Sequence, residues 1–206
     1  MRVSADAVNE LLSLHASRQF ARMESRARTL LDGDEGSAIV HELLGMALAA
    51  QNRHADALVP LRQAVAVAPD DAQFWENLAL CQRQLGDFVE AERSLRKSLA
   101  LRPISPETAN ALGSVLRSLR RHEEALQLFR QALSYNEHHA AAAVNLGNTL
   151  RDLGRMAEAE ASYRRAIAID PGNARAHCYL GIVLNETGRP GSIIYCCLKH
   201  RLCHGP

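Results

Sequence analysis

Apolar residues recur three and four positions apart along almost the whole chain, which is the spacing of one face of an α-helix. Between Ala140 and Asn173 this pattern fills two segments, 140–152 and 156–169, which Gly154-Arg155 separates. A glycine there is typical of a helix C-terminus, because glycine adopts the left-handed backbone conformation without strain. The stretch therefore predicts two antiparallel helices joined by a tight turn.

The same pattern returns every 34 residues in both directions, without an insertion. The repeat frames begin at Ser4, Ala38, Ala72, Pro106, Ala140 and Ala174. First helices are therefore predicted at 38–50, 72–84, 106–118, 140–152 and 174–187, and second helices at 54–67, 88–101, 122–135 and 156–169. The frame at 4–37 is degenerate, although its apolar spacing still favours helices.

The turns between first and second helices differ in sequence. Gly86 occupies the same place as Gly154, whereas Gln51-Asn52 and Arg120-Arg121 replace the glycine in two other frames. Of these replacements, only the asparagine is suited to a left-handed conformation.

Small and large residues occupy fixed positions of the frame, which are numbered 1 to 34 from its first residue. Position 8 is small in Gly45, Ala79, Gly113 and Gly147, and position 20 is small in Ala57, Ala91, Ala125 and Ala159. Position 24 is large in Leu61, Leu95, Phe129 and Tyr163. Small residues allow two helices to approach closely, so each pair is predicted to pack tightly with the large residue filling the seam. Proline at Pro69, Pro103 and Pro171 ends the second helices.

Leu-Gly-x-x-Leu, Ala-x-x-x-aromatic and a late proline at a 34-residue period resemble the tetratricopeptide repeat. The resemblance implies an all-α fold, a right-handed α-solenoid of antiparallel helix pairs. It covers 4–189, with a degenerate repeat (4–37), four complete ones (38–71, 72–105, 106–139, 140–173) and an incomplete one (174–189). Residues 190–206 match nothing upstream. They are interpreted as a truncated or frameshifted end of a longer protein, a makeshift cap or a functional tail.

Composition narrows the class of partner. The 206 residues carry a net charge of only +1, and 4% of them are aromatic, so neither nucleic acid nor an anionic membrane is an expected partner. No apolar run is long enough to cross a bilayer, and Met1–Glu10 lacks the apolar core of a secretory signal. A cytoplasmic location is the expectation.

The sequence holds no motif of catalysis. It contains neither a phosphate-binding glycine loop nor a Gly-x-Ser-x-Gly elbow, so no enzyme activity and no cofactor are expected. The tail offers zinc-binding residue types in Cys196, Cys197, His200, Cys203 and His204. Their spacing is not that of a known zinc finger, so no metal site is predicted.

The resemblance also implies a binding surface, because the first helices of tetratricopeptide repeats line a concave groove. Positions 2, 5, 6, 9, 12 and 13 generally face it. The candidate groove residues are Asn77, Arg83, Asn110, Ser114, Arg117, Asn145, Asn148 and Arg151. Neighbouring helices lie about 8–10 Å apart, and an extended chain advances about 3.3 Å per residue, so one helix meets roughly every third peptide residue. Asparagine can pair with a peptide backbone and arginine with carboxylates, which predicts an acidic peptide. The alternative is a merely solvated surface.

Two functions follow from this. The first is a stand-alone protein-interaction module. The second is the substrate-recruiting arm of a larger enzyme, since Asn77-Leu78-Ala79 and Asn145-Leu146-Gly147 are similar to the repeat arms of O-linked N-acetylglucosamine transferases and of bacterial glycosyltransferases and sulfotransferases. Lysine is absent from the groove positions, so a chaperone-tail clamp is not expected. The first helix of the incomplete repeat, predicted at 174–187, has no second helix to pack against. Self-association through this end of the array is therefore also expected.

Overall fold

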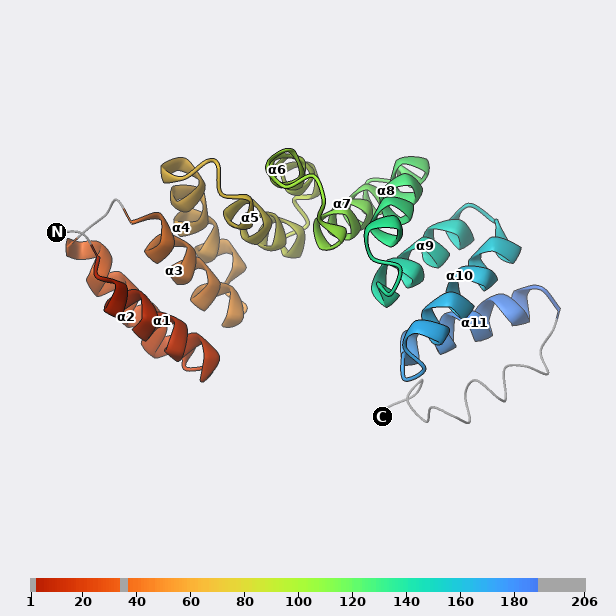
Figure 1. The fold of residues 1–206 in the computed structure, drawn as a ribbon, viewed down its shortest axis with the longest axis horizontal. Coiled ribbons are helices and arrows are strands. Elements are labelled where there is room, and N and C mark those ends of the chain that lie inside the picture. The colour runs from red at the N-terminus through yellow and green to blue at the C-terminus, as the bar shows by residue number, and fades with distance from the viewer. Residues whose placement is uncertain (1–2, 34–36, 189–206) are drawn as a thin grey trace. The chain divides into compact units, whose positions relative to one another are not determined.

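The computed structural model describes residues 3–33 and 37–188. This part of the chain forms eleven α-helices and no strand (Figure 1). The helices are α1 (Ala5–Ala16), α2 (Phe20–Gly33), α3 (Ala38–Ala50), α4 (His54–Val67), α5 (Ala72–Gln84), α6 (Phe88–Leu101), α7 (Pro106–Ser118), α8 (His122–Tyr135), α9 (Ala140–Asp152), α10 (Met156–Ile169) and α11 (Ala174–Glu186). The structure therefore confirms the all-helical prediction.

Helix boundaries agree with the predicted ones, with one difference. α3 to α10 begin and end at the predicted residues, whereas α11 ends at Glu186 and not at Thr187, which is its C-cap. Polar side chains fix several starts: Asp71 accepts a hydrogen bond from the amide of Gln73 at 2.8 Å, and Ser105 accepts one from Thr108 at 3.2 Å. Such caps satisfy amides that have no partner inside the helix.

The turns between paired helices share one backbone geometry. Every residue with a positive φ in the described part lies at the same repeat position: Arg18, Asn52, Gly86, Arg120, Gly154 and Gly188. Around Arg120, its own amide donates to the carbonyl of Arg117 at 3.0 Å and the next amide donates to Leu116 at 2.9 Å. These two bonds form the Schellman motif, which satisfies the last carbonyls of a helix. The left-handed conformation was predicted only for glycine and asparagine, but Arg18 and Arg120 adopt it as well.

Glycine at position 8 is required by close packing inside three helix pairs. A Cβ atom added to Gly45 would lie 2.5 Å from Cγ of Leu61, and one added to Gly147 would lie 2.6 Å from Cε1 of Tyr163. The corresponding distance from Gly113 to Phe129 is 2.7 Å. These distances confirm that a large residue at position 24 fills the seam against a small one at position 8.

The chain divides into two compact units, residues 1–103 with α1 to α6 and residues 104–206 with α7 to α11. The first unit has a core around Leu43, Leu48 and Leu61, whose exposed fractions are 2% or less. In the second unit, Leu126 and Tyr163 are fully buried. Within each unit the first helices contact one another, α1 with α3 and α3 with α5, then α7 with α9 and α9 with α11. Each unit therefore presents a layer of adjacent first helices.

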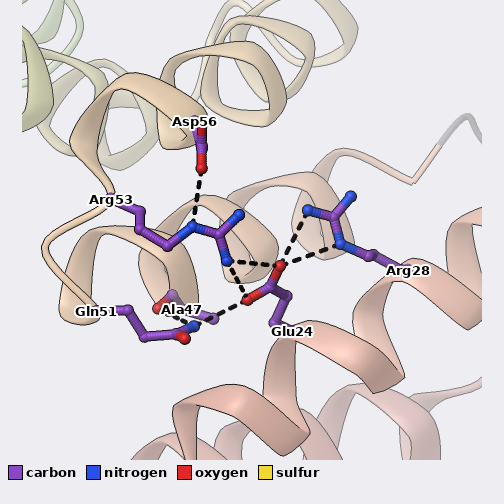
Figure 2. Close-up of polar contacts among 6 residues, drawn as sticks. All are labelled: Glu24, Arg28, Ala47, Gln51, Arg53 and Asp56. Carbon is purple, nitrogen blue, oxygen red and sulfur yellow. Dashed lines mark hydrogen bonds and ion pairs between the residues drawn. The ribbon is translucent and has the colours of Figure 1, made fainter.

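A polar cluster joins the degenerate first pair to its neighbour. Figure 2 shows the carboxylate of Glu24 between the guanidinium groups of Arg28 and Arg53, at 3.0 and 2.9 Å, with the amide of Gln51 also donating to it at 3.0 Å. Arg53 pairs in turn with Asp56 at 2.8 Å. Burial raises the pKa of Glu24, but the hydrogen bonds from Gln51, Arg28 and Arg53 outweigh it and lower the pKa overall. Ionised Glu24 thus links α2 to the turn between α3 and α4.

Candidate functional site

In the second unit, the amide of Asn145 on α9 bridges to α7. Its Nδ2 donates to Oδ1 of Asn110 at 2.8 Å and to Oγ of Ser114 at 3.3 Å. Among the described residues, Oδ1 of Asn145 accepts no hydrogen bond and Nδ2 of Asn110 donates none. The structure therefore brings three predicted residues together and leaves one acceptor and one donor available to a ligand.

The two predicted arginines of this unit have different surroundings. Nε of Arg117 donates to Oδ2 of Asp152 at 2.7 Å, so its charge is already paired. The guanidinium carbon of Arg151 lies 5.5 Å from the centre of the Tyr179 ring. A cation–π contact positions a guanidinium without neutralising it. Of the two, Arg151 is the better placed to meet an anion.

A small pocket of about 100 Å³ adjoins the Asn145 amide. Asn145 lines it together with Asn173 and Arg175, and Ala141 and Val144 complete the wall. The side chain of Arg175 makes no hydrogen bond or ion pair with any residue that the structure describes. It is absent from the predicted set although it occupies position 2 of the frame that begins at Ala174, and that position was expected to face the groove. An amide and an unpaired guanidinium at one small pocket favour a carboxylate.

Asn148 has a different role from that of the other predicted residues. Its side chain is buried, the residue being 6% exposed, and its Oδ1 accepts a hydrogen bond from the Tyr163 hydroxyl at 2.8 Å. Burial raises the pKa of Tyr163, so this hydroxyl stays protonated and continues to donate. Asn148 therefore supports the packing of α9 on α10. The sequence contained a signal for this hydrogen bond. This repeat has tyrosine at position 24 and asparagine at position 9, whereas the preceding repeat has Phe129 and Ser114 at these positions.

In the first unit, Asn77 on α5 makes the bond that Asn145 makes on α9. Its Nδ2 donates to Oε1 of Glu42 on α3 at 2.6 Å. Glu42 is 8% exposed, and burial raises its pKa to about 7, an effect that the Asn77 hydrogen bond reduces and the charge of Asp71 increases. The side chain of Arg83, the remaining predicted residue, makes no hydrogen bond or ion pair with any residue in 3–33 or 37–188.

An apolar pocket of about 260 Å³ lies on the same unit. α1, α3, α4 and α5 contribute to its lining, which consists of His15, Gly45, Met46, Ala49, Ala50, His54, Leu61, Asn77, Leu80, Cys81 and Gln84. Burial raises the pKa of the Cys81 thiol to about 11, so the thiol is neutral and poorly nucleophilic at neutral pH. Apart from Asn77, no member of this lining was predicted, although Met46 and Leu80 occupy position 9 of their frames.

Ranges 3–33 and 37–188 contain no group of three or more His, Cys, Asp or Glu residues that could hold a metal ion. None of the described helices combines the length and the apolar character that crossing a bilayer requires. The cysteines and histidines considered for zinc, from Cys196 to His204, lie outside the described residues.

Four family models match the chain, and each is described as a tetratricopeptide repeat. They match residues 38–63, 70–138, 110–174 and 162–195. No curated protein matches the chain.

Solved structures with this arrangement include Pseudomonas aeruginosa pilF, with a TM-score of 0.83 and 18% identity over 98% of this chain and 92% of that one. MamA from Desulfovibrio magneticus has a TM-score of 0.71 and 18% identity over 79% and 92%. YrrB, described as a TPR protein with an unusual peptide-binding site, has a TM-score of 0.68 and 20% identity over 85% and 94%. At these identities the likeness shows a shared fold, a solenoid of stacked helix pairs.

Proposed function

Because the chain is built of tetratricopeptide repeats, we propose that it is a protein-interaction module whose first-helix layer binds an extended, acidic peptide. The observation that carries the proposal is the Asn145 amide, which bonds to Asn110 and Ser114 on the neighbouring helix at 2.8 and 3.3 Å. These bonds hold the side chain in place before a ligand arrives, which reduces the entropy that binding would cost.

The fixed amides suit a peptide main chain. Oδ1 of Asn145 is available to accept from a peptide N–H, and Nδ2 of Asn110 is available to donate to a peptide carbonyl. Neither interaction depends on the peptide side chain. Adjacent first helices about 8–10 Å apart would meet every third residue of an extended chain that advances about 3.3 Å per residue.

Acidic side chains of the peptide would lie near α9 and α11. Arg151 keeps its charge beside Tyr179, and Arg175 lines the pocket that Asn145 also lines. Arg117 contributes less, since Asp152 already pairs with it at 2.7 Å. In this proposal Asn148 acts indirectly, by holding Tyr163 in the core beneath the surface.

The test is fluorescence anisotropy with a labelled Glu-rich peptide and a Gln-substituted counterpart. The double change R151A/R175A should weaken binding of the Glu-rich peptide about tenfold at low salt, since each exposed charge pair contributes about 0.2–1 kcal/mol. R165A is the matched control, because Arg165 is an exposed arginine on α10. N145A should weaken both peptides, since main-chain pairing is common to both. Equal loss with R165A, or equal binding of both peptides by the unaltered chain, would contradict the proposal.

The same surface would serve a recruiting arm of a larger glycosyltransferase or sulfotransferase. Support for this second function comes from the resemblance of Asn77-Leu78-Ala79 and Asn145-Leu146-Gly147 to the repeat arms of such enzymes; both asparagines also make the same bond to the neighbouring repeat, to Glu42 and to Asn110. A reading frame for a catalytic domain directly downstream in the genomic DNA would support it. Its absence would leave the stand-alone module.

A further inference from the structure

The apolar pocket of the first unit differs chemically from the polar surface that is proposed to bind a peptide on the second unit. Position 9 of the repeat carries Met46 and Leu80 here, where α7 and α9 carry Ser114 and Asn148. Leu80 is 43% exposed, so apolar surface is left in contact with water. Covering such surface is favourable, by roughly 25 cal/mol for each Å² removed from water.

The size of the pocket limits what it can hold. Its volume of about 260 Å³ lies below the range of roughly 300–1,000 Å³ typical of small-molecule and cofactor sites. A single aliphatic side chain fits within this volume. The wall is also adaptable, because Met46 has a flexible, unbranched side chain that can adjust to the shape of an occupant.

The polar groups around the pocket indicate the charge of the occupant. The lining includes two histidines and no carboxylate. The carboxyl group of Glu42 behind Asn77 is 8% exposed and bonded to that amide at 2.6 Å, so it offers little charge to a ligand. Arg83 lies three residues beyond Leu80 on α5, and its side chain has no ion partner among the described residues. A positive group on α5 beside the lining residue Gln84 complements an apolar side chain that has an acidic neighbour.

We propose that this pocket binds one leucine- or methionine-sized side chain of the partner peptide, next to an acidic residue that meets Arg83. The inference rests on the proposed function in that the occupant belongs to a bound peptide. It adds a sequence requirement that the main-chain and carboxylate contacts of the second unit do not impose.

The experiment compares the labelled Glu-rich peptide carrying one central leucine with the same peptide carrying serine there. The leucine peptide should bind the unaltered chain about tenfold more tightly, as expected for partial burial of a leucine side chain. A50F, which places an aromatic ring in the pocket from the exposed end of α3, should abolish this advantage. L80S should reduce it, and L101S is its control, because Leu101 on α6 is also 43% exposed and is not part of the lining.

The outcomes separate the two proposals. If both peptides bind equally and R151A/R175A weakens both, the pocket inference is wrong while the proposed function stands. An advantage that survives A50F also overturns the inference. If neither peptide binds, both proposals fail. If A50F instead converts a dimer into a monomer in sedimentation and the leucine advantage is missing, the pocket holds a second copy of the chain and the inference is again wrong. A shift of the Met46 methyl resonance that occurs with the leucine peptide alone would support the inference directly.

Discussion

Replacing Glu42 with glutamine should stabilise the protein at alkaline pH. Burial raises the pKa of Glu42 from 4.5 to about 7, so the unfolded chain releases its proton at lower pH than the folded chain does. Stability therefore falls as the pH rises from about 4.5 to about 7, and the full penalty persists above that range. With about 1.4 kcal/mol for each pH unit between these two pKa values, 4.5 and about 7, the ionised carboxylate costs the folded chain roughly 3 kcal/mol.

E42Q removes the charge and keeps an oxygen that can accept the Asn77 hydrogen bond of 2.6 Å. Its free energy of unfolding should exceed that of the unaltered chain by up to roughly 3 kcal/mol at pH 8 and by less than about 1 kcal/mol at pH 5. Urea unfolding followed by circular dichroism at both pH values measures the difference. E76Q is the control, since Glu76 occupies the same position in the next repeat but accepts from Ser98 at 2.8 Å and pairs with Arg102 at 3.8 Å. A gain of equal size at both pH values, or none at pH 8, would refute the reasoning.

Three further stability predictions can be measured by the same unfolding assay. G147A should destabilise by about 1–3 kcal/mol, because the new methyl group would lie 2.6 Å from the Tyr163 ring, whereas G181A meets no described atom within 4 Å and should stabilise by about 0.5–1 kcal/mol. Equal effects of these two changes would count against the packing argument. R120G should stabilise by about 1 kcal/mol, because φ is +62° at Arg120, and a loss of stability would show that its side chain outweighs the strain. Y163F should cost about 1–2 kcal/mol by leaving the buried carbonyl of Asn148 without its donor, and an unchanged midpoint would contradict that bond.

Much of the fold could be predicted because one set of residues recurs at a fixed period. Pro171 and Gly154 delimit α10, and the constant 34-residue period carries these bounds to frames that lack the glycine or the proline, so α3 to α10 match their predicted bounds. Packing followed from residue size alone. A small residue at Gly147 and a large one at Tyr163 suffice to predict that the two helices approach closely.

The binding surface was harder to predict, because repeat position says which way a side chain points but not what it meets. Arg117 and Arg151 share one position, yet the first pairs with Asp152 and the second lies over Tyr179. Asn148 was expected at the groove, and its bond to Tyr163 depends on a partner fifteen residues away on another helix. The pocket around Leu80 escaped prediction because several helices contribute to it and no single frame contains it.

The uniform left-handed turn has a consequence for how such a chain can change length. An arginine, an asparagine or a glycine holds the same conformation at this point, so the geometry belongs to the pair of helices as a whole. Adding or deleting one residue within a pair would rotate one helix by about 100° and bury its polar side. Duplicating or excising an entire pair leaves every turn as it was. Evolution of this chain is therefore expected to proceed in whole modules of one fixed length.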